Sequence, residues 1–332
     1  MTVPFSQQTQ RQQLDVLRPI AQHACAQFGI VPVSLRVVNH GFNTTYAATT
    51  ASGARYALRL GTNSLRDAAG LAAELQWIDA LATDGRINVA PPHKTATGQW
   101  AIVLPVAALH RAIPATLSHW LPGRLVGGRP STAQLRALGQ TMAQLHRHSA
   151  HWSPQGNAAF PPVNTLWMNS TESISSSTHP SVTPRLRDMV AQAIGQMTAV
   201  YAQLDQQFAV QPIHADLHGY NLMWHAGQLS VFDFDDAGLG WPIQDLAIAS
   251  YYVRDIPGAE QHIRAGYTQV GSVPAVSDAV FETLLMARGV LLFNDVLVIE
   301  SAGERAFIPE YCRRVELRLE HFLTSGTFAL LQ

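Results

Sequence analysis

Several residues between positions 213 and 236 have the types and the spacing of a site that handles phosphate and a metal ion. Asn221 stands just before one short apolar run and Asp233 just after a second, and Ala226-Gly227 between the runs predicts a hairpin. A hairpin brings its outer ends together, so the amide oxygen and the carboxylate could share Mg²⁺, a hard ion that takes its other ligands from water and phosphate. Asp216 would stand beside that ion, where it could orient an attacking hydroxyl and accept its proton.

Other interpretations of these residues stay open. His214, Asp216 and His218 could form a transition-metal cluster, as in hydrolases, although no further run of ligands follows. The acids between 233 and 236 could be a polar turn after a strand. Asp235 could contact a second metal ion or the substrate, or only cap that turn. His214 is expected to pack behind the metal-binding aspartate rather than to act as an acid or base.

The elements that would position this segment divide the chain into two parts. The first begins with a helix over 8–28, and short β-branched or aromatic runs between turns then predict antiparallel strands over 34–38, 44–50, 55–60, 100–106 and 115–120. The second is mainly helical, with helices expected after the N-cap Ser131 and over 184–208, 243–254, 259–270, 278–298 and 304–322. A small sheet followed by a helical body predicts the α+β class in two lobes, 1–121 and 122–332.

The first lobe holds one cation and one carboxylate that are expected to pair. A helix should follow Ser64, which we predict as its N-cap with Asp67 reaching back in a capping box. Glu74 lies on or beside the apolar stripe of that helix, where a charge is costly unless it is paired. Arg59, on the third predicted strand, is its natural partner. A structural salt bridge without a role in chemistry would give the same pattern.

The motif His-Ala-Asp-x-x-x-x-Asn followed by Phe-Asp-Phe-Asp resembles the catalytic and metal-binding segments of the aminoglycoside phosphotransferase and choline kinase family. That family is a branch of the protein-kinase-like fold. Asp245-Leu-Ala after Gly-Trp-Pro resembles the family too, where such an aspartate braces the catalytic loop, and so does the helix around 138–146. The resemblance covers nearly the whole chain and is weakest over 151–184. The stretch 225–245 is also similar to homoserine-kinase-like and stress-response-kinase members.

The resemblance implies a role for each of these residues. Asp216 would be the catalytic base, and Asn221 and Asp233 would hold Mg²⁺. Arg59, held by Glu74, would steady the phosphates of ATP. Protein kinases carry a lysine at this strand position, and an arginine keeps the charge and can bind two phosphate oxygens at once.

The turn 40–45 would lie over the phosphates, with Gly41, Asn43 and Thr44 as nucleotide-binding residues whose main-chain amides contact them. It lacks the Gly-x-Gly-x-x-Gly of protein kinases, so the turn alone is a weak signal. Adenine would pack near 118–121, at the connection between the lobes.

Composition excludes several other classes of protein. The 332 residues carry a formal net charge of -1, so no basic field points to nucleic acid, and an apolar fraction of 47% can form a core. Cys25 and Cys312 are far apart, which fits a reducing compartment, and no secretory signal begins the chain. Arg288, Asn294 and Asp295 interrupt the most apolar window, 284–299, which we interpret as a buried helix rather than a membrane span. We therefore expect a cytoplasmic protein without a nucleic-acid or membrane partner.

The predicted activity is transfer of the γ-phosphoryl group of ATP, with Mg²⁺, to a hydroxyl of a small molecule. The C-terminal helices offer acids and aromatics that would favour an amine-bearing acceptor such as an amino alcohol, amino sugar or hydroxy amino acid; these residues are Asp255, Glu260, Glu282, Asp295, Glu300, Tyr251, Tyr252 and Phe293. Two alternatives stay open. A protein Ser/Thr kinase of the same fold would need an open groove and a flexible segment, for which 173–178 is a candidate. A non-catalytic nucleotide-binding module would need a damaged catalytic set.

Overall fold

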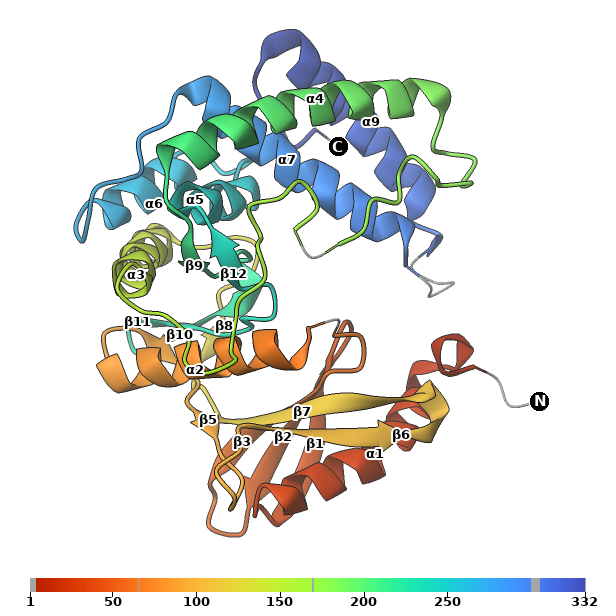
Figure 1. Ribbon diagram of the computed structural model, residues 1–332, viewed down its shortest axis with the longest axis vertical. Helices are drawn as coiled ribbons and strands as arrows, with labels where there is room; N and C mark the ends of the chain where they lie inside the picture. The colour runs from red at the N-terminus through yellow and green to blue at the C-terminus, as the bar shows by residue number, and fades with distance from the viewer. Residues whose placement is uncertain (1–3, 65, 169, 300–304, 332) are drawn as a thin grey trace. The chain divides into compact units, whose positions relative to one another are not determined.

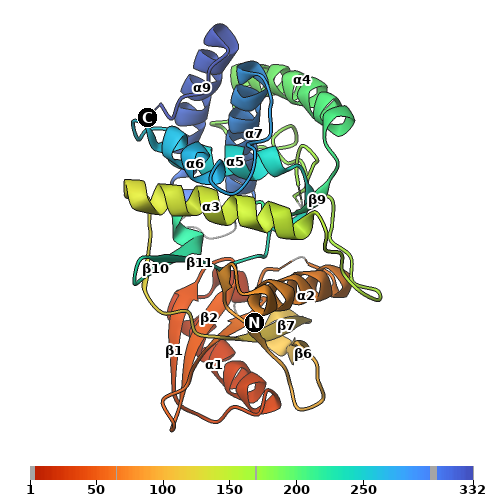
Figure 2. The same ribbon diagram turned by 90° about the vertical axis from the view of Figure 1, so that its left-hand side faces the viewer.

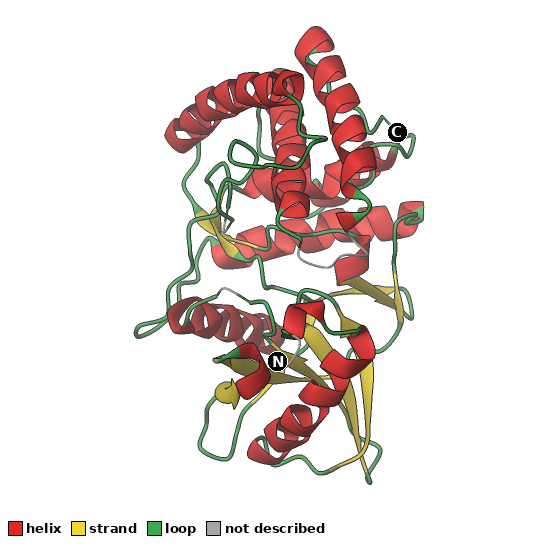
Figure 3. Ribbon diagram, turned by 90° about the vertical axis from the view of Figure 1, so that its right-hand side faces the viewer, coloured by secondary structure: helices red, strands yellow, loops and turns green. Residues whose placement is uncertain are grey.

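The computed structural model describes residues 4–64, 66–168, 170–299 and 305–331. Two compact units share the chain. The first comprises 1–122 with two later segments, 154–159 and 230–235, and the second comprises 123–153, 160–229 and 236–332. Strands dominate the first unit and helices the second (Figure 3). The helix predicted after Ser64 and the helix predicted over 304–322 each include a residue outside the described ranges, at positions 65 and 304.

The first unit is built on an antiparallel sheet with the strand order β1-β2-β3-β7-β5, in which β6 also pairs with β7. Its strands are β1 (Pro32–His40), β2 (Thr44–Thr50), β3 (Arg55–Leu60), β5 (Pro92–His93), β6 (Ala101–Val106) and β7 (Arg111–His119). Thr45 of β2 pairs with Arg59 of β3, which pairs in turn with Thr116 of β7. Arg59 therefore projects from a central strand.

Helix α1 (Gln10–Gln27) begins at Thr9, which forms a capping box with Gln12. It lies against the sheet (Figure 1), and buried side chains of the helix and the strands form a common core, including Leu17, Cys25, Tyr46, Leu58 and Ile113. Gly29, with φ 72°, follows the helix in the left-handed conformation that ends many helices. The predicted helix 8–28 thus forms with nearly its predicted bounds.

Helix α2 (Ala68–Asp84) differs from its prediction at the N-terminus. Its N-cap is Asp67, whose side chain accepts from the amide of Gly70 at 2.7 Å, so the capping box expected from Ser64 does not form. The helix therefore starts three residues later than predicted, and a single acidic cap satisfies the amide of Gly70 in its first turn. The unit is completed by β4 (Asn88–Val89), which pairs in parallel with Ser230 and Val231 of β11 (Gln228–Val231).

In the described residues, the second unit consists of six helices and several short strands, and the helices make up most of it (Figure 2). The helices are α3 (Thr132–Ser149), α4 (Pro184–Gln207), α5 (Pro242–Tyr251), α6 (Ala259–Tyr267), α7 (Asp278–Leu297) and α9 (Ile308–Ser325), of which α6 is the shortest. Ser131 caps α3 with a capping box through Gln134, as predicted. Two antiparallel strands, β9 (Gln211–Ile213) and β12 (Gly238–Gly240), lie among these helices.

The remaining strands of the second unit carry the predicted hairpin. Strand β8 (Arg124–Leu125) pairs with β10 (Leu222–His225), and Ala226 and Gly227, with φ 47° and 80°, lead from β10 into β11. Two positive φ values in a two-residue loop are typical of the turns that close hairpins. The described part of the chain contains no helix that is both long and apolar enough for a membrane span.

Candidate active site

The loop that carries Asp216 follows β9 and is held by a buried aspartate from α5. Asp245 is fully buried and accepts from the amides of His214 at 3.1 Å and Ala215 at 2.7 Å. The same carboxylate lies 3.0 Å from Nε2 of the buried His146 on α3. Ala215 has φ 63°, a conformation that costs energy in a residue with a side chain and persists where neighbours enforce it. The bracing role implied for Asp245 is therefore present in the structure.

We expect Asp245→Asn to destabilise the fold by about 2–4 kcal/mol, because it leaves two loop amides and a histidine with one weaker acceptor. Urea unfolding measures this change. Asp255→Asn is the matched control, because Asp255 makes a solvent-exposed pair with Arg129. Its loss should change stability by less than about 1 kcal/mol. Equal effects of the two variants would contradict the bracing role.

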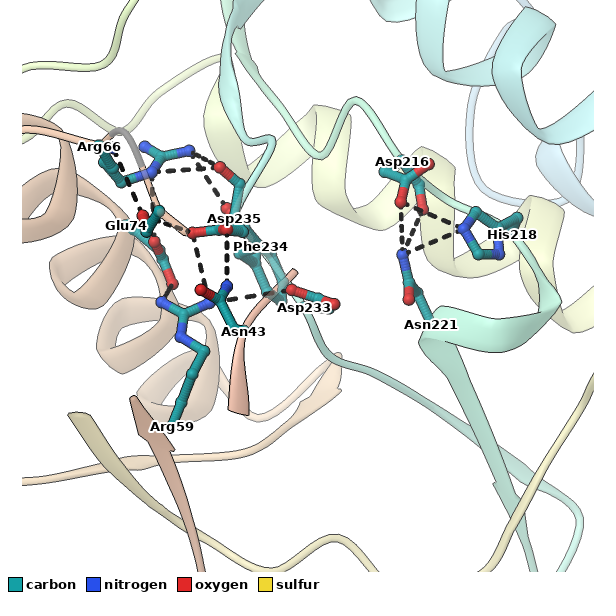
Figure 4. A network of polar contacts seen from close by, with 11 residues as sticks. Asn43, Arg59, Arg66, Glu74, Asp216, His218, Asn221, Asp233, Phe234 and Asp235 are labelled. Carbon is teal, nitrogen blue, oxygen red and sulfur yellow. Dashed lines mark hydrogen bonds and ion pairs between the residues drawn. The ribbon is translucent and has the colours of Figure 1, made fainter. Parts of the chain in front are cut away.

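Among the described residues, side chains of the second unit contact the carboxylate of Asp216 from several directions. Asn221 donates through Nδ2 to Oδ2 at 2.8 Å, and Nε2 of His218 lies 3.1 Å from the same oxygen (Figure 4). Arg288 of α7 donates through Nη2 to Oδ1. Arg288 also donates to the hydroxyl of Tyr252 at 2.8 Å, and the rings of His218 and Tyr252 lie 4.3 Å apart. The carboxylate is thus fixed in place by residues from the loop and from two helical segments.

The amide of Asn221 has one defined orientation. Nδ2 of Asn221 donates to the main-chain carbonyl of Asp216 at 3.0 Å and also to the carboxylate of Asp216. The amide oxygen is therefore the atom that could bind a cation, as the predicted role requires. Asn221 ends a short 3₁₀ turn (Gly219–Asn221) that packs closely on Gly127. A Cβ at Gly219 would lie only 1.9 Å from the Gly127 carbonyl oxygen, so the close approach requires glycine there.

Sequence reasoning missed Arg288 as part of this site. The signal was a charged residue inside an apolar helix, and a buried charge requires a partner. Arg288 is 7% exposed, and its partner is a residue 72 positions earlier in the chain. The spacing of apolar residues along the helix predicts that the side chain of Arg288 is buried, but it does not predict which group the side chain contacts.

Burial raises the pKa of the Asp216 carboxyl, but the hydrogen bond from His218 and the charge of Arg288 outweigh it, so the pKa lies below its ordinary value. Asp216 is therefore ionised at neutral pH. We expect Arg288→Met to raise this pKa, since burial then dominates. The acid limb of kcat/KM should move to higher pH, with loss of activity as pH falls through the raised pKa. Rate profiles from pH 4.5 to 8 measure it, and an unmoved limb would contradict this assignment.

Within the first unit, Glu74 holds two arginines. Arg59 donates through Nη2 to Oε1 of Glu74 at 2.6 Å, and Nε of Arg66 lies 3.4 Å from Oε2 (Figure 4). The side chain of Glu74 is 2% exposed, and burial raises the pKa of its carboxyl while both arginines act against that shift. The predicted Arg59–Glu74 pair is present, and Arg66 is a second partner that the sequence did not predict.

The segment after β11 brings two more acids to Arg59. Its Nη1 lies 3.8 Å from Oδ1 of Asp233 and 3.6 Å from Oδ1 of Asp235. Asp233 has φ 62° and its side chain is about half exposed at 48%, whereas Asp235 is 14% exposed. Three carboxylates against two guanidinium groups leave this cluster with one negative charge in excess, which a bound cation would balance.

Asp235 ties the turn 40–45 to this cluster. Its Oδ2 accepts from Nδ2 of Asn43 at 2.9 Å, and its main-chain carbonyl accepts from Arg66. The hydrogen bond from Nδ2 fixes the orientation of the Asn43 amide and therefore the position of its Oδ1. That buried oxygen accepts no hydrogen bond from the described residues. A ligand that donates there would complete it. Asp235 thus contacts both Asn43 and Arg66, and the role that the sequence left open stays untested.

The turn itself is preorganised. The amide of Gly41 donates to the carbonyl of Asn43 at 3.2 Å, and the fully buried Thr44 hydroxyl lies 2.8 Å from Nδ1 of His40. Thr62 donates to the carbonyl of Phe42 at 3.2 Å. Thr44 therefore holds the turn through its side chain, and its nucleotide-binding role stays a prediction.

The structure places the predicted nucleotide-binding residues, together with Asp233, in the first unit, and Asp216 and Asn221 in the second. The sharing of one cation by Asn221 and Asp233 stays a prediction. The acids expected to attract an amine are engaged elsewhere: Arg129 pairs with Asp255, Arg254 with both Glu260 and Glu282, and Ser170 donates to Asp295. Glu300 lies outside the described residues.

Comparison with known proteins assigns the family. The model of the phosphotransferase enzyme family matches residues 34–272. The chain belongs to this family. The predicted family and the predicted class of enzyme, a phosphotransferase, are thereby confirmed.

Relatives of this phosphotransferase include amicoumacin kinase of Bacillus subtilis (strain 168), which is 39% identical over 57 residues. That match spans only 17% of the length of either protein.

Solved structures share the fold over nearly the whole chain. An amicoumacin kinase in complex with AMP-PNP, Ca²⁺ and Ami has a TM-score of 0.73 at 21% identity, covering 93% of this chain and 96% of that one. A microcompartment-associated aminopropanol kinase has a TM-score of 0.75 at 21% identity, covering 95% and 100%. The predicted α+β kinase-like fold is confirmed.

Proposed function

We propose that this phosphotransferase transfers the γ-phosphoryl group of ATP, with Mg²⁺, to a hydroxyl of a small molecule such as an amino alcohol, amino sugar or hydroxy amino acid. The observation that carries this proposal is the oriented Asp216–Asn221 pair, in which one amide fixes the base and keeps its own oxygen for a metal. The relatives that are kinases of amicoumacin and of aminopropanol support a small hydroxylated acceptor.

Asp216 orients the acceptor hydroxyl and accepts its proton as the bond from the hydroxyl oxygen to the γ-phosphorus forms and the bond to the bridging oxygen breaks, which releases ADP. Its low pKa keeps it ionised, and the contacts of Arg288 and His218 hold one rotamer of the carboxylate. Most catalysis of phosphoryl transfer is positioning and electrostatics, so a fixed weak base suffices.

The nucleotide would bind to the first unit. Arg59 would contact the phosphates with the edge of its guanidinium that faces Asp233 and Asp235, while Glu74 holds the opposite edge. Gly41, Asn43 and Thr44 would present main-chain groups of the turn to the same phosphates. Mg²⁺ held by Asn221 and Asp233 would neutralise charge that develops on the phosphate oxygens.

The described residues do not favour either alternative, a protein Ser/Thr kinase or a non-catalytic nucleotide-binding module. The segment 173–178 is anchored, because Arg187 donates to the carbonyls of Ile174, Ser175 and Ser177 and Ile174 is buried. It therefore does not favour a protein Ser/Thr kinase. A non-catalytic binding module would lack part of the predicted catalytic set. The chain retains every member of that set, namely Asp216, Asn221, Asp233, Arg59 and Glu74.

The test measures ATP consumption with Mg²⁺ across amino alcohols, aminoglycosides, hydroxy amino acids, sugars and a generic protein substrate. Turnover of one small acceptor is the expected result. Turnover of only the protein substrate, or none at all with Mg²⁺–ATP bound, would reject the proposal.

A further inference from the structure

A small hollow lies in the second unit beside the arginine that holds Asp216. It has room for a group about the size of one water molecule. Most of the residues that line it are apolar, and the lining residues with polar side-chain groups are Tyr201, Gln244 and Arg288. The remaining lining residues are Leu166, Met168, Ala247, Ile248, Leu284, Ala287 and Leu291. Helices α5 and α7 supply most of them.

Arg288, which lines this hollow, has an unused hydrogen-bond donor. Its Nη2 serves Asp216 and Tyr252, but its buried Nε donates to none of the described residues. Leaving a buried donor without an acceptor is costly, so such a group marks a place where a ligand or water completes the structure.

Gln244 contributes the opposite kind of group. Its Nε2 donates to the carbonyl of Val163 at 2.7 Å, which fixes the orientation of the amide. Its Oε1 is buried and accepts no hydrogen bond within the described part of the chain. Gln244 is 4% exposed, so bulk solvent does not serve this oxygen. One small hollow is thus lined by residues with an unused donor and an unused acceptor.

We propose that this hollow binds a second hydroxyl group of the acceptor, beside the hydroxyl that Asp216 activates. This inference rests on the proposed function. A hydroxyl accepts from Arg288 and donates to Gln244, whereas a carboxylate would meet the glutamine oxygen and an ammonium group the guanidinium.

Arg288 links the two positions, because it contacts Asp216 through one nitrogen of its guanidinium and its unused Nε belongs to the same group. The simplest acceptor that offers a hydroxyl at each position is a 1,2- or 1,3-diol, a class that includes amino diols and sugars.

The experiment measures binding by calorimetry in the presence of Mg²⁺–AMP-PNP, so that no turnover is needed. The probes are 3-amino-1,2-propanediol and 1-amino-2-propanol, which differ by one hydroxyl, with glycerol and 1,2-propanediol as the pair without an amine. We expect the compound with the additional hydroxyl to bind about tenfold more tightly in at least one pair, because its analogue leaves buried polar groups without partners.

Two variants fill the hollow from different helices, Ala247→Val on α5 and Ala287→Val on α7. Each variant should reduce the difference in affinity between the compound with the additional hydroxyl and its analogue to within about twofold. The affinity for Mg²⁺–AMP-PNP should stay unchanged. Ala249→Val is the matched control, since Ala249 is buried on the same helix as Ala247 but does not line the hollow. It should keep the preference, and melting temperatures verify that each variant folds.

Equal binding of the compounds in both pairs, or no binding of any probe, overturns the inference and leaves the hollow a site for a single water. A preference that survives both filling variants overturns it as well. Absence of phosphorylation of any probe, with the binding preference intact, counts against the proposed function and not against this subsite.

Discussion

Asp216→Asn is expected to lower kcat by about a thousandfold, within the range of about 10²–10⁴ that a positioned base contributes. Affinity for Mg²⁺–AMP-PNP should change by less than about threefold, because the proposed contacts to the nucleotide itself come from the first unit and the main-chain carbonyl at position 216 still orients Asn221. Single-turnover phosphorylation of the acceptor found in the panel, with nucleotide binding measured in parallel, gives both numbers.

The asparagine keeps the shape of the side chain but removes its charge and one acceptor. Arg288 then loses its ion partner while it remains buried, so a lower melting temperature should accompany the loss of activity. Asp278→Asn, in the exposed first turn of α7, is the control for an unrelated acid. A variant that retains more than a tenth of the wild-type kcat would remove Asp216 from the role of base.

Asp233→Asn is expected to lower kcat by about a hundredfold or more and to raise the Mg²⁺ concentration needed for half-maximal activity by about tenfold. The carboxylate is the one charged oxygen ligand proposed for the metal, and an amide binds a hard cation more weakly. Asparagine tolerates the left-handed conformation that Asp233 adopts, so the substitution does not add backbone strain. Activity measured against Mg²⁺ at saturating ATP tests this prediction.

The matched control makes the same change two residues later. Asp235→Asn retains an oxygen that can accept from Asn43, so it should raise KM for ATP by less than about tenfold and leave the Mg²⁺ requirement unchanged. If both variants shift the Mg²⁺ requirement equally, Asp233 has no special role in binding metal.

Local patterns predicted the elements of this protein better than they predicted its buried polar contacts. The strands around Arg59, the helix of Glu74, the loop of Asp216 and the hairpin before Asp233 follow from alternation, capping and turn residues. The Arg59–Glu74 pair was predictable because a charge beside an apolar stripe needs a partner and one cation stood on the neighbouring strand.

Arg66, Arg288 and Asp235 could not be assigned in this way. Arg66 contacts Asp235 across 169 positions, and Arg288 contacts Asp216 across 72. Contacts at such separations depend on tertiary packing, which leaves no period in the sequence. The pairing of Arg254 with Glu260 and Glu282 shows the same limit, since a count of acids does not reveal which charges are already neutralised.

The division of the first unit along the chain has a consequence for how this protein is made. Phe234 is buried and packs edge-to-face on Trp77 at 5.4 Å, β4 pairs with Ser230 and Val231, and Asp235 holds Asn43. A ribosome has synthesised the sheet long before it adds these residues. During synthesis, the sheet and α2 therefore lack these contacts, and Trp77 is not covered by Phe234, until more than a hundred further residues have been added. During that interval the growing chain is most exposed to aggregation and to chaperones.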